Sequence, residues 1–160
     1  MFGVAQNVKG LIGNSMDLWK TELTVNGDVL GSVDINRGIF QGDSFFPLIF
    51  VMVMIPLTLI LRDMPQGFKY GNVDELLNHL LFMDDLKLYA SSEEDLRLLL
   101  DTVECYSSDI GMQFGVDKCA TLVVKNGKRV SSADVVLQNG EVMKEVSGEG
   151  YKYLGVLQNK

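Results

Sequence analysis

Two adjacent aspartates, Asp84 and Asp85, stand between two apolar runs of the chain, residues 79–83 and 86–90. Apolar runs on both sides of a short polar centre predict a β-hairpin with the acids at its turn. Because successive side chains on a regular strand point to opposite faces, two adjacent carboxylates reach one site only at a turn. Carboxylates on a tight turn suit Mg²⁺, which takes oxygen ligands and often shares them with phosphate. The alternative is a solvated acidic turn without a metal.

The composition bounds the class of protein. A length of 160 residues, with 47% hydrophobic and 22% charged residues, fits one ordinary globular domain. Cys105 and Cys119 are too few for a disulfide framework or a structural zinc site, so we expect an intracellular protein, with nucleus and cytoplasm left open. The net charge of −7 argues against nucleic-acid binding by this chain alone, because nucleic-acid binders usually carry a basic excess.

Two amphipathic helices are predicted. Apolar residues recur at helical spacing over residues 4–19, and again from residue 96 to residue 110. Ser92 precedes the second helix as an N-cap candidate, and Gly111 is expected to end it.

Residues 45–61 are almost entirely apolar. A polar pair at 43–44 can cap a helix here, Pro47 is tolerated in its first turn, and Pro56 is expected to kink its middle. The length approaches that of a transmembrane helix, so a membrane-anchored fragment is one hypothesis. A helix buried in a globular core explains the same pattern. We prefer this interpretation and expect no membrane association.

The predicted strands are bounded by Asn-Gly pairs. Asn26-Gly27 lies between strand-like runs at 20–25 and 28–33, which is a strong hairpin signal. Further strands are expected at 112–114 and 119–124, and further turns at Asn126-Gly127 and Asn139-Gly140.

The aspartate pair belongs to a longer pattern. Phe82-Met83-Asp84-Asp85 has the form aromatic-X-Asp-Asp, the active-site signature of reverse transcriptases. Further blocks at 37–50, 111–120 and 151–155 follow the order of the same family. Over residues 1–158 the chain therefore resembles the reverse transcriptases of retrotransposons that lack long terminal repeats.

The resemblance implies an α+β fold, a partial polymerase palm. An antiparallel sheet would contain the Asp-Asp hairpin, and two main helices would pack on one of its faces. Residues 1–160 would form a single partial reverse transcriptase domain, without the strand that carries the family's first catalytic aspartate. The ancestral reaction would be RNA-directed DNA synthesis by two-metal nucleotidyl transfer, with Mg²⁺, an RNA template and a DNA primer.

The same resemblance assigns roles to individual residues. Asp84 would bind metal and Asp85 would support it, whereas Lys118 would donate a proton to the departing pyrophosphate. Gln41 and Gly42 would contact the nucleotide and the template. Tyr151 and Tyr153 would make a primer-grip-like contact. The chain departs from the family at Phe45-Phe46, where a Leu-Ser pair is usual, and this is expected either to narrow the nucleotide pocket or to repack the helix.

Activity is the open question at this point. We found no substitute for the first catalytic aspartate, so the fragment is expected to be inactive alone. The alternative function is a non-catalytic module derived from a palm, which binds a protein or a nucleic acid. His79, the only histidine, has no ligand partner nearby in sequence and is interpreted as a packing or surface residue.

Overall fold

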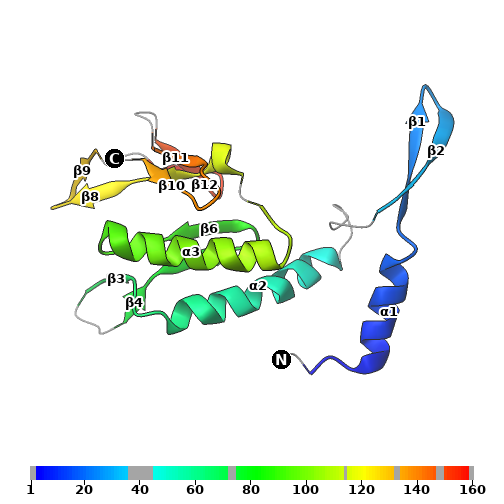
Figure 1. Ribbon diagram of the computed structural model, residues 1–160, viewed down its shortest axis with the longest axis horizontal. Coiled ribbons are helices and arrows are strands. Elements are labelled where there is room, and N and C mark those ends of the chain that lie inside the picture. The colour runs from blue at the N-terminus through cyan, green and yellow to red at the C-terminus, as the bar shows by residue number, and fades with distance from the viewer. Residues whose placement is uncertain are drawn as a thin grey trace. The chain divides into compact units, whose positions relative to one another are not determined.

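The computed structural model describes residues 3–35, 45–71, 75–113, 115–131, 134–146 and 150–158 (Figure 1). The chain divides into two compact units, Met1–Phe46 and Pro47–Lys160, and each unit is described by itself. The predicted capping pair at 43–44 lies outside the described residues. The prediction of one partial domain over residues 1–160 stays a prediction.

The described residues of the first unit form one helix and one hairpin. Helix α1 (Gln6–Met16) precedes strands β1 (Lys20–Val25) and β2 (Asp28–Asp34). Asn26 and Gly27 connect the strands with φ values of 53° and 92°, as a type I′ turn requires, so the predicted hairpin is confirmed. None of the described side chains of this unit is buried, and the unit therefore has no core among them.

The second unit holds the remaining elements. Its helices are α2 (Phe46–Asp63), which begins one residue before the unit boundary, α3 (Glu93–Asp109) and the short 3₁₀ turn η1 (Val116–Lys118). Its strands are β3 (Phe68–Lys69), β4 (Leu76–Leu77), β5 (His79–Phe82), β6 (Asp85–Leu88), β7 (Ala120–Thr121), β8 (Val123–Lys125), β9 (Lys128–Val130), β10 (Val135–Val136), β11 (Val142–Glu145), β12 (Tyr151–Tyr153) and β13 (Val156–Gln158).

The described strands form several small sheets. The pairs β3–β4, β5–β6, β8–β9 and β12–β13 are antiparallel, whereas a three-stranded sheet has the order β10-β11-β7 with β11 parallel to β7. The α+β class is therefore as predicted. The single antiparallel sheet is not found among these residues, because the hairpins pair within themselves.

Helix α3 begins and ends as its sequence predicts. The Ser92 hydroxyl accepts a hydrogen bond from the Asp95 amide at 3.1 Å. At the other end Gly111 has a φ of 72°, its amide bonds to the Ser108 carbonyl, and the Met112 amide bonds to the Ser107 carbonyl. This is a Schellman motif. The strand predicted at 112–114 is wrong for residues 112 and 113, because the Met112 amide closes the helix instead of joining a sheet.

The predicted strand at 119–124 is also only partly right. It is divided into β7 and β8 by Leu122, which is not in a strand. The two pieces join different sheets, since β7 pairs with β11 and β8 pairs with β9. The chain therefore leaves one sheet and enters another within the segment that was predicted as a single strand.

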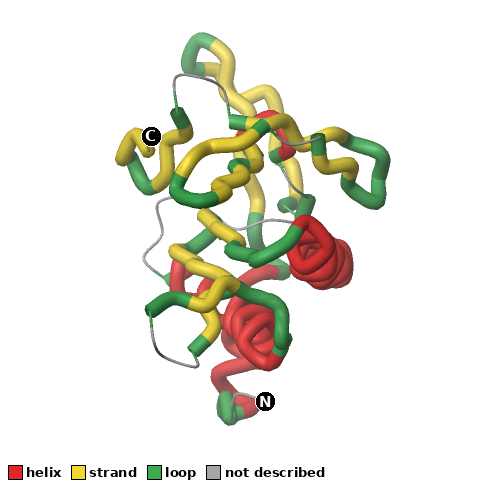
Figure 2. The backbone as a smooth tube through the Cα atoms, turned by 90° about the vertical axis from the view of Figure 1, so that its left-hand side faces the viewer, coloured by secondary structure: helices red, strands yellow, loops and turns green. Residues whose placement is uncertain are grey.

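The main core lies between α2, α3 and the β5–β6 hairpin. Leu57 and Leu61 of α2 and Leu99 of α3 have no exposed surface, and Val103 is 2% exposed. Partly buried side chains of the hairpin pack on this cluster, namely Leu81, Leu86 and Leu88. Both helices thus cover one face of the hairpin (Figures 1 and 2).

Helix α2 buries only one face although it is apolar all round. Leu57 is fully buried, whereas Leu59 is 55% exposed, so the prediction of a helix buried in the core holds for one side. Among the described residues, no helix has the length and apolar character needed to cross a membrane. Pro56 lies inside the helix as predicted, and near it the Tyr106 hydroxyl of α3 donates a hydrogen bond to the Val53 carbonyl. This bond ties the two helices together beside the proline, which offers no amide hydrogen.

A smaller core lies on a neighbouring face of α3. Leu100 packs there against Leu137 and Met143, and partly buried neighbours include Val116 and Cys119. Helix α3 therefore contacts α2 and the hairpin with some residues and the C-terminal strands with others. In this way the helix links the aspartate hairpin to the segment that contains Lys118.

Candidate active site

The Asp84-Asp85 pair lies at the tip of the β5–β6 hairpin. Phe82 pairs with Asp85, so Met83 and Asp84 form a two-residue turn and Asp85 is the first residue of β6. Met83 has a φ of 53°, a left-handed conformation that costs a non-glycine residue about 1–2 kcal/mol. Both carboxylates are exposed. The tight turn thus presents two acidic side chains on a strained backbone, a feature that recurs at functional sites.

The two faces of the hairpin differ in chemistry. Leu81, Leu86 and Leu88 point toward the helical core, whereas Asp85 and Lys87 alternate with them on the outer face. The ladder continues by one pair, because the Tyr89 amide donates a hydrogen bond to the Asn78 carbonyl at 2.8 Å. The outer face of β6 therefore carries a carboxylate, a cation and a phenol in sequence.

The C-terminal tyrosines lie close to this outer face. Burial raises the pKa of Tyr151 above its usual value, and the Cys119 thiol and the Asp85 carboxylate raise it further. Burial also raises the pKa of Tyr153, with contributions from Tyr89, Asp85 and Tyr151. A carboxylate acts in this way only when it is near, since its charge opposes a second anion. The centre of the Tyr153 ring also lies 5.3 Å from the ammonium of Lys87, which shares a strand face with Asp85. The C-terminal tyrosines and the outer face of β6 therefore form one neighbourhood.

The backbone of Lys118 contacts one of these tyrosines. The Tyr151 hydroxyl donates a hydrogen bond to the Lys118 carbonyl at 3.0 Å, while the Lys118 side chain is exposed. The next residue, Cys119, has a thiol whose pKa is raised by burial and by the neighbouring Asp117. The exposed Lys118 ammonium does not pack in the core. Nothing in the described structure assigns it a catalytic role.

The donor set at the turn suits a hard cation in part. Asp84 and Asp85 supply carboxylate oxygens, the ligand type that Mg²⁺ prefers. Within the described ranges, no group of three or more His, Cys, Asp and Glu side chains is arranged to hold a metal ion. The pair fits an ion that takes its other ligands from phosphate, water or further acidic residues.

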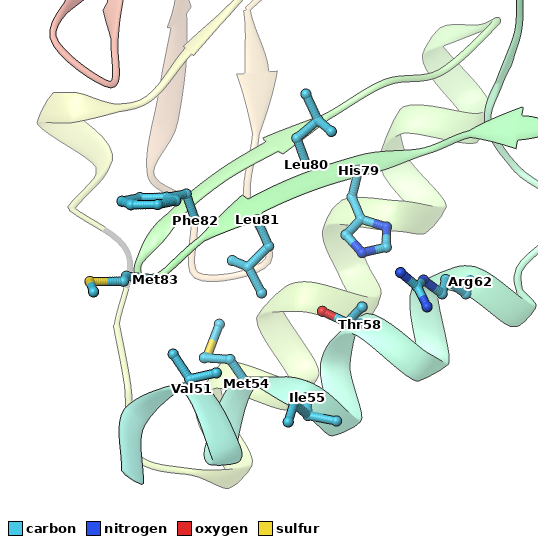
Figure 3. A pocket seen from close by; sticks show the side chains of 10 residues that line it. All are labelled: Val51, Met54, Ile55, Thr58, Arg62, His79, Leu80, Leu81, Phe82 and Met83. Carbon is cyan, nitrogen blue, oxygen red and sulfur yellow. The ribbon is translucent and has the colours of Figure 1, made fainter. Parts of the chain in front are cut away.

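A groove of about 490 Å³ runs between α2 and β5 and ends at Met83 of the Asp84-Asp85 turn (Figure 3). Leu81 and His79 point toward α2, whereas Leu80 and Phe82 point away from it. The His79 ring lies near Arg62, and its pKa is lowered by burial and by the Arg62 charge. Its Nδ1 atom lies 2.7 Å from the Asn78 side-chain oxygen. These contacts agree with a packing role for His79.

Two groups of predicted residues need separate mention. Gln41 and Gly42 lie outside the described residues, as does the side chain of Phe46, so their predicted roles stay predictions. The densest basic segment, at 125–129, forms the β8–β9 hairpin. There Arg129 forms an ion pair with Glu145 at 3.3 Å.

One participant in the neighbourhood was missed from the sequence. The Lys87 ammonium lies 5.4 Å from the centre of the Tyr89 ring and 5.3 Å from the centre of the Tyr153 ring. The alternation of Asp85, Lys87 and Tyr89 along one strand could have placed three of these groups on one face. No local pattern points to Tyr153, which comes from a distant part of the chain.

A sequence model of the family described as reverse transcriptase (RNA-dependent DNA polymerase) matches residues 4–157. The chain is 31% identical over 142 residues to the retrovirus-related Pol polyprotein from type-2 retrotransposable element R2DM of Drosophila melanogaster. That alignment covers 83% of this chain and 13% of the relative.

Two further relatives are similar. Pol polyproteins from type-1 retrotransposable element R2 are 32% identical over 129 residues in Nasonia vitripennis and 27% identical over 159 residues in Popillia japonica. These alignments cover 77% and 97% of this chain. The chain spans between 12% and 26% of the length of the three relatives.

Proposed function

Because this chain belongs to the reverse transcriptase family, we propose that it is the part of a polymerase palm that carries the metal-binding turn. The resemblance to retrotransposon enzymes without long terminal repeats is confirmed. The observation that carries the proposal is the exposed Asp84-Asp85 turn at the tip of a hairpin held by two helices. The reaction would be RNA-directed DNA synthesis, with an RNA template and a DNA primer bound by the complete protein.

In this proposal each nearby residue has one task. Asp84 binds a metal ion from the turn, and Asp85 supports it from the first position of β6. When bound, Mg²⁺ supplies stabilisation of the negative charge on the attacking and leaving oxygens. Lys118, with its exposed ammonium, donates a proton to the leaving pyrophosphate. Tyr151 and Tyr153 contact the primer beside the carboxylates.

Three further parts of the proposal concern what completes the site. Gln41 and Gly42 contact the nucleotide and the template, and Phe45-Phe46 narrows the pocket beside them. A further carboxylate is needed, since two adjacent acids on one turn do not readily hold two metal ions about 4 Å apart. We place that carboxylate in a strand outside residues 1–160. In this proposal, residues 1–160 form one partial domain.

A binding module without catalysis is the second candidate. The observation that favours it is the groove between α2 and β5, next to which Leu80 and Phe82 are 44% and 58% exposed. Exposed apolar side chains on β5, whose second edge has no partner among the described strands, suit a protein partner. The net charge of −7 disfavours nucleic acid as the partner of the isolated chain.

The purified chain alone is expected to give no primer extension on an RNA template. A chimera is expected to extend the primer if residues 4–157 replace the matching segment of the Drosophila melanogaster relative, because the rest of that protein supplies the missing ligand. The relative itself is the positive control, and circular dichroism checks that both test proteins fold. A folded chimera without extension, at any Mg²⁺ or Mn²⁺ concentration, would favour the binding module.

A further inference from the structure

Lys87 connects two elements that are far apart in the sequence. Its ammonium lies over the Tyr89 ring, which directly follows β6, and over the Tyr153 ring, which belongs to β12. Both distances to the ring centres, 5.4 and 5.3 Å, lie within the range of about 6 Å in which a cation is attracted to an aromatic face. One cation is therefore shared by two rings.

The β12–β13 hairpin depends on such side-chain contacts. Among the described strands, β12 and β13 pair only with each other, and an isolated two-stranded hairpin is marginally stable in water. The hydrogen bond from Tyr151 to the Lys118 carbonyl fixes one point of β12. The contact of Tyr153 with Lys87 fixes a second point, two residues further along the same face of the strand.

Lys87 also lies close to the Asp84-Asp85 turn in the sequence and on the strand. Asp85 and Lys87 lie on the same face of β6, two residues apart. A side chain that holds Tyr153 over β6 thus sets the distance between the tyrosines and the carboxylates.

We propose that Lys87 is a positioning residue that fixes the β12–β13 hairpin beside the Asp84-Asp85 turn by holding its ammonium between Tyr89 and Tyr153. The structural half of this proposal stands by itself. Its consequence for primer positioning rests on the proposed function. A positively charged side chain with a flexible stem suits this place, because its ammonium can reach both rings.

Hydrogen exchange in the full chain tests the structural half. Lys87→Met keeps the length of the side chain and removes its charge, so the amides of β12 and β13 are expected to exchange about tenfold faster. Lys87→Arg is expected to keep their protection, because a guanidinium also binds aromatic faces. Lys69→Met, on the exposed strand β3, is the matched control and is expected to change nothing in β12–β13. Unchanged protection in Lys87→Met would overturn the proposal.

A spectroscopic measurement supports the same test. The ε-methylene protons of Lys87 lie near two ring faces, so their NMR signals are expected upfield of those of Lys69. Tyr153→Leu is expected to reduce this shift without abolishing it, since Tyr89 remains. Signals at the ordinary lysine position would also overturn the proposal, whether or not the protein polymerises.

Kinetics of the chimera test the functional half. Lys87→Met is expected to raise KM for the primer–template by about tenfold with a smaller change in kcat. Lys87→Arg is expected to have the KM of the parent chimera. If the exchange and NMR results hold but the kinetics do not change, the positioning role is wrong while the polymerase function stands. If the parent chimera has no activity, the proposed function fails, and the exchange and NMR results alone decide the Lys87 contact.

Discussion

Asp84→Asn is expected to lower kcat for primer extension by the chimera by about a thousandfold or more. The amide keeps the shape of the side chain but loses the charge that we propose binds a divalent cation. A metal ion supplies several kcal/mol of transition-state stabilisation, and each 1.36 kcal/mol corresponds to a factor of about ten in rate. Steady-state kinetics with saturating primer and nucleotide give the result directly.

Two matched variants separate catalysis from general charge effects. Asp85→Asn removes the second acid of the pair and is expected to have a smaller effect, because in the proposed function this residue only supports the metal ligand Asp84. Asp109→Asn removes an exposed carboxylate at the end of α3 and is expected to leave extension unchanged. Folding should survive in all three variants, since each side chain is exposed. A loss of less than tenfold in Asp84→Asn would contradict the assignment.

Leu57→Ala is expected to lower the free energy of unfolding of the chain by about 2–5 kcal/mol. Leu57 is fully buried at the centre of the cluster that includes Leu61, Leu99 and Val103, so truncation leaves a cavity between the helices. Such a loss is a large share of the 5–15 kcal/mol that stabilises an ordinary domain. Urea denaturation followed by circular dichroism measures the change.

Leu59→Ala is the control for the same chemical change on the same helix. Leu59 is 55% exposed, so its truncation is expected to cost about 0.5 kcal/mol or less. The difference between the two variants reports whether α2 buries the face that contacts α3. Equal costs at both positions would show that this packing is wrong.

Local chemistry explains which elements could be predicted from the sequence. Asn26-Gly27 specifies its turn, because both positions need positive φ. Ser92 and Gly111 specify the ends of α3, because each satisfies backbone groups that the helix leaves unpaired. The position of Asp84 at a turn follows from the apolar runs on either side. Each of these predictions depends on residues a few positions apart.

Contacts between distant segments explain what could not be predicted. The division of residues 119–124 into β7 and β8 depends on partners in β11 and β9, and nothing in the local pattern distinguishes the two pieces. Met112 looked like a strand residue, but its amide is used by the end of α3. The position of Lys87 between Tyr89 and Tyr153 depends on how the C-terminal strands pack, which periodicity along one strand does not report.

The central claim is that the Asp84-Asp85 turn is a metal-binding site, and titration of the chain with Mn²⁺ tests it most directly. Two adjacent carboxylates without phosphate or a further acid are expected to bind the ion with an affinity on the order of millimolar or weaker. The paramagnetic ion broadens the NMR signals of nearby nuclei. Signals from residues 83–86 should therefore disappear first, and Asp84→Asn should prevent this. Broadening that begins instead at Glu93, Glu94 and Asp95, the acidic first turn of α3, would contradict the account.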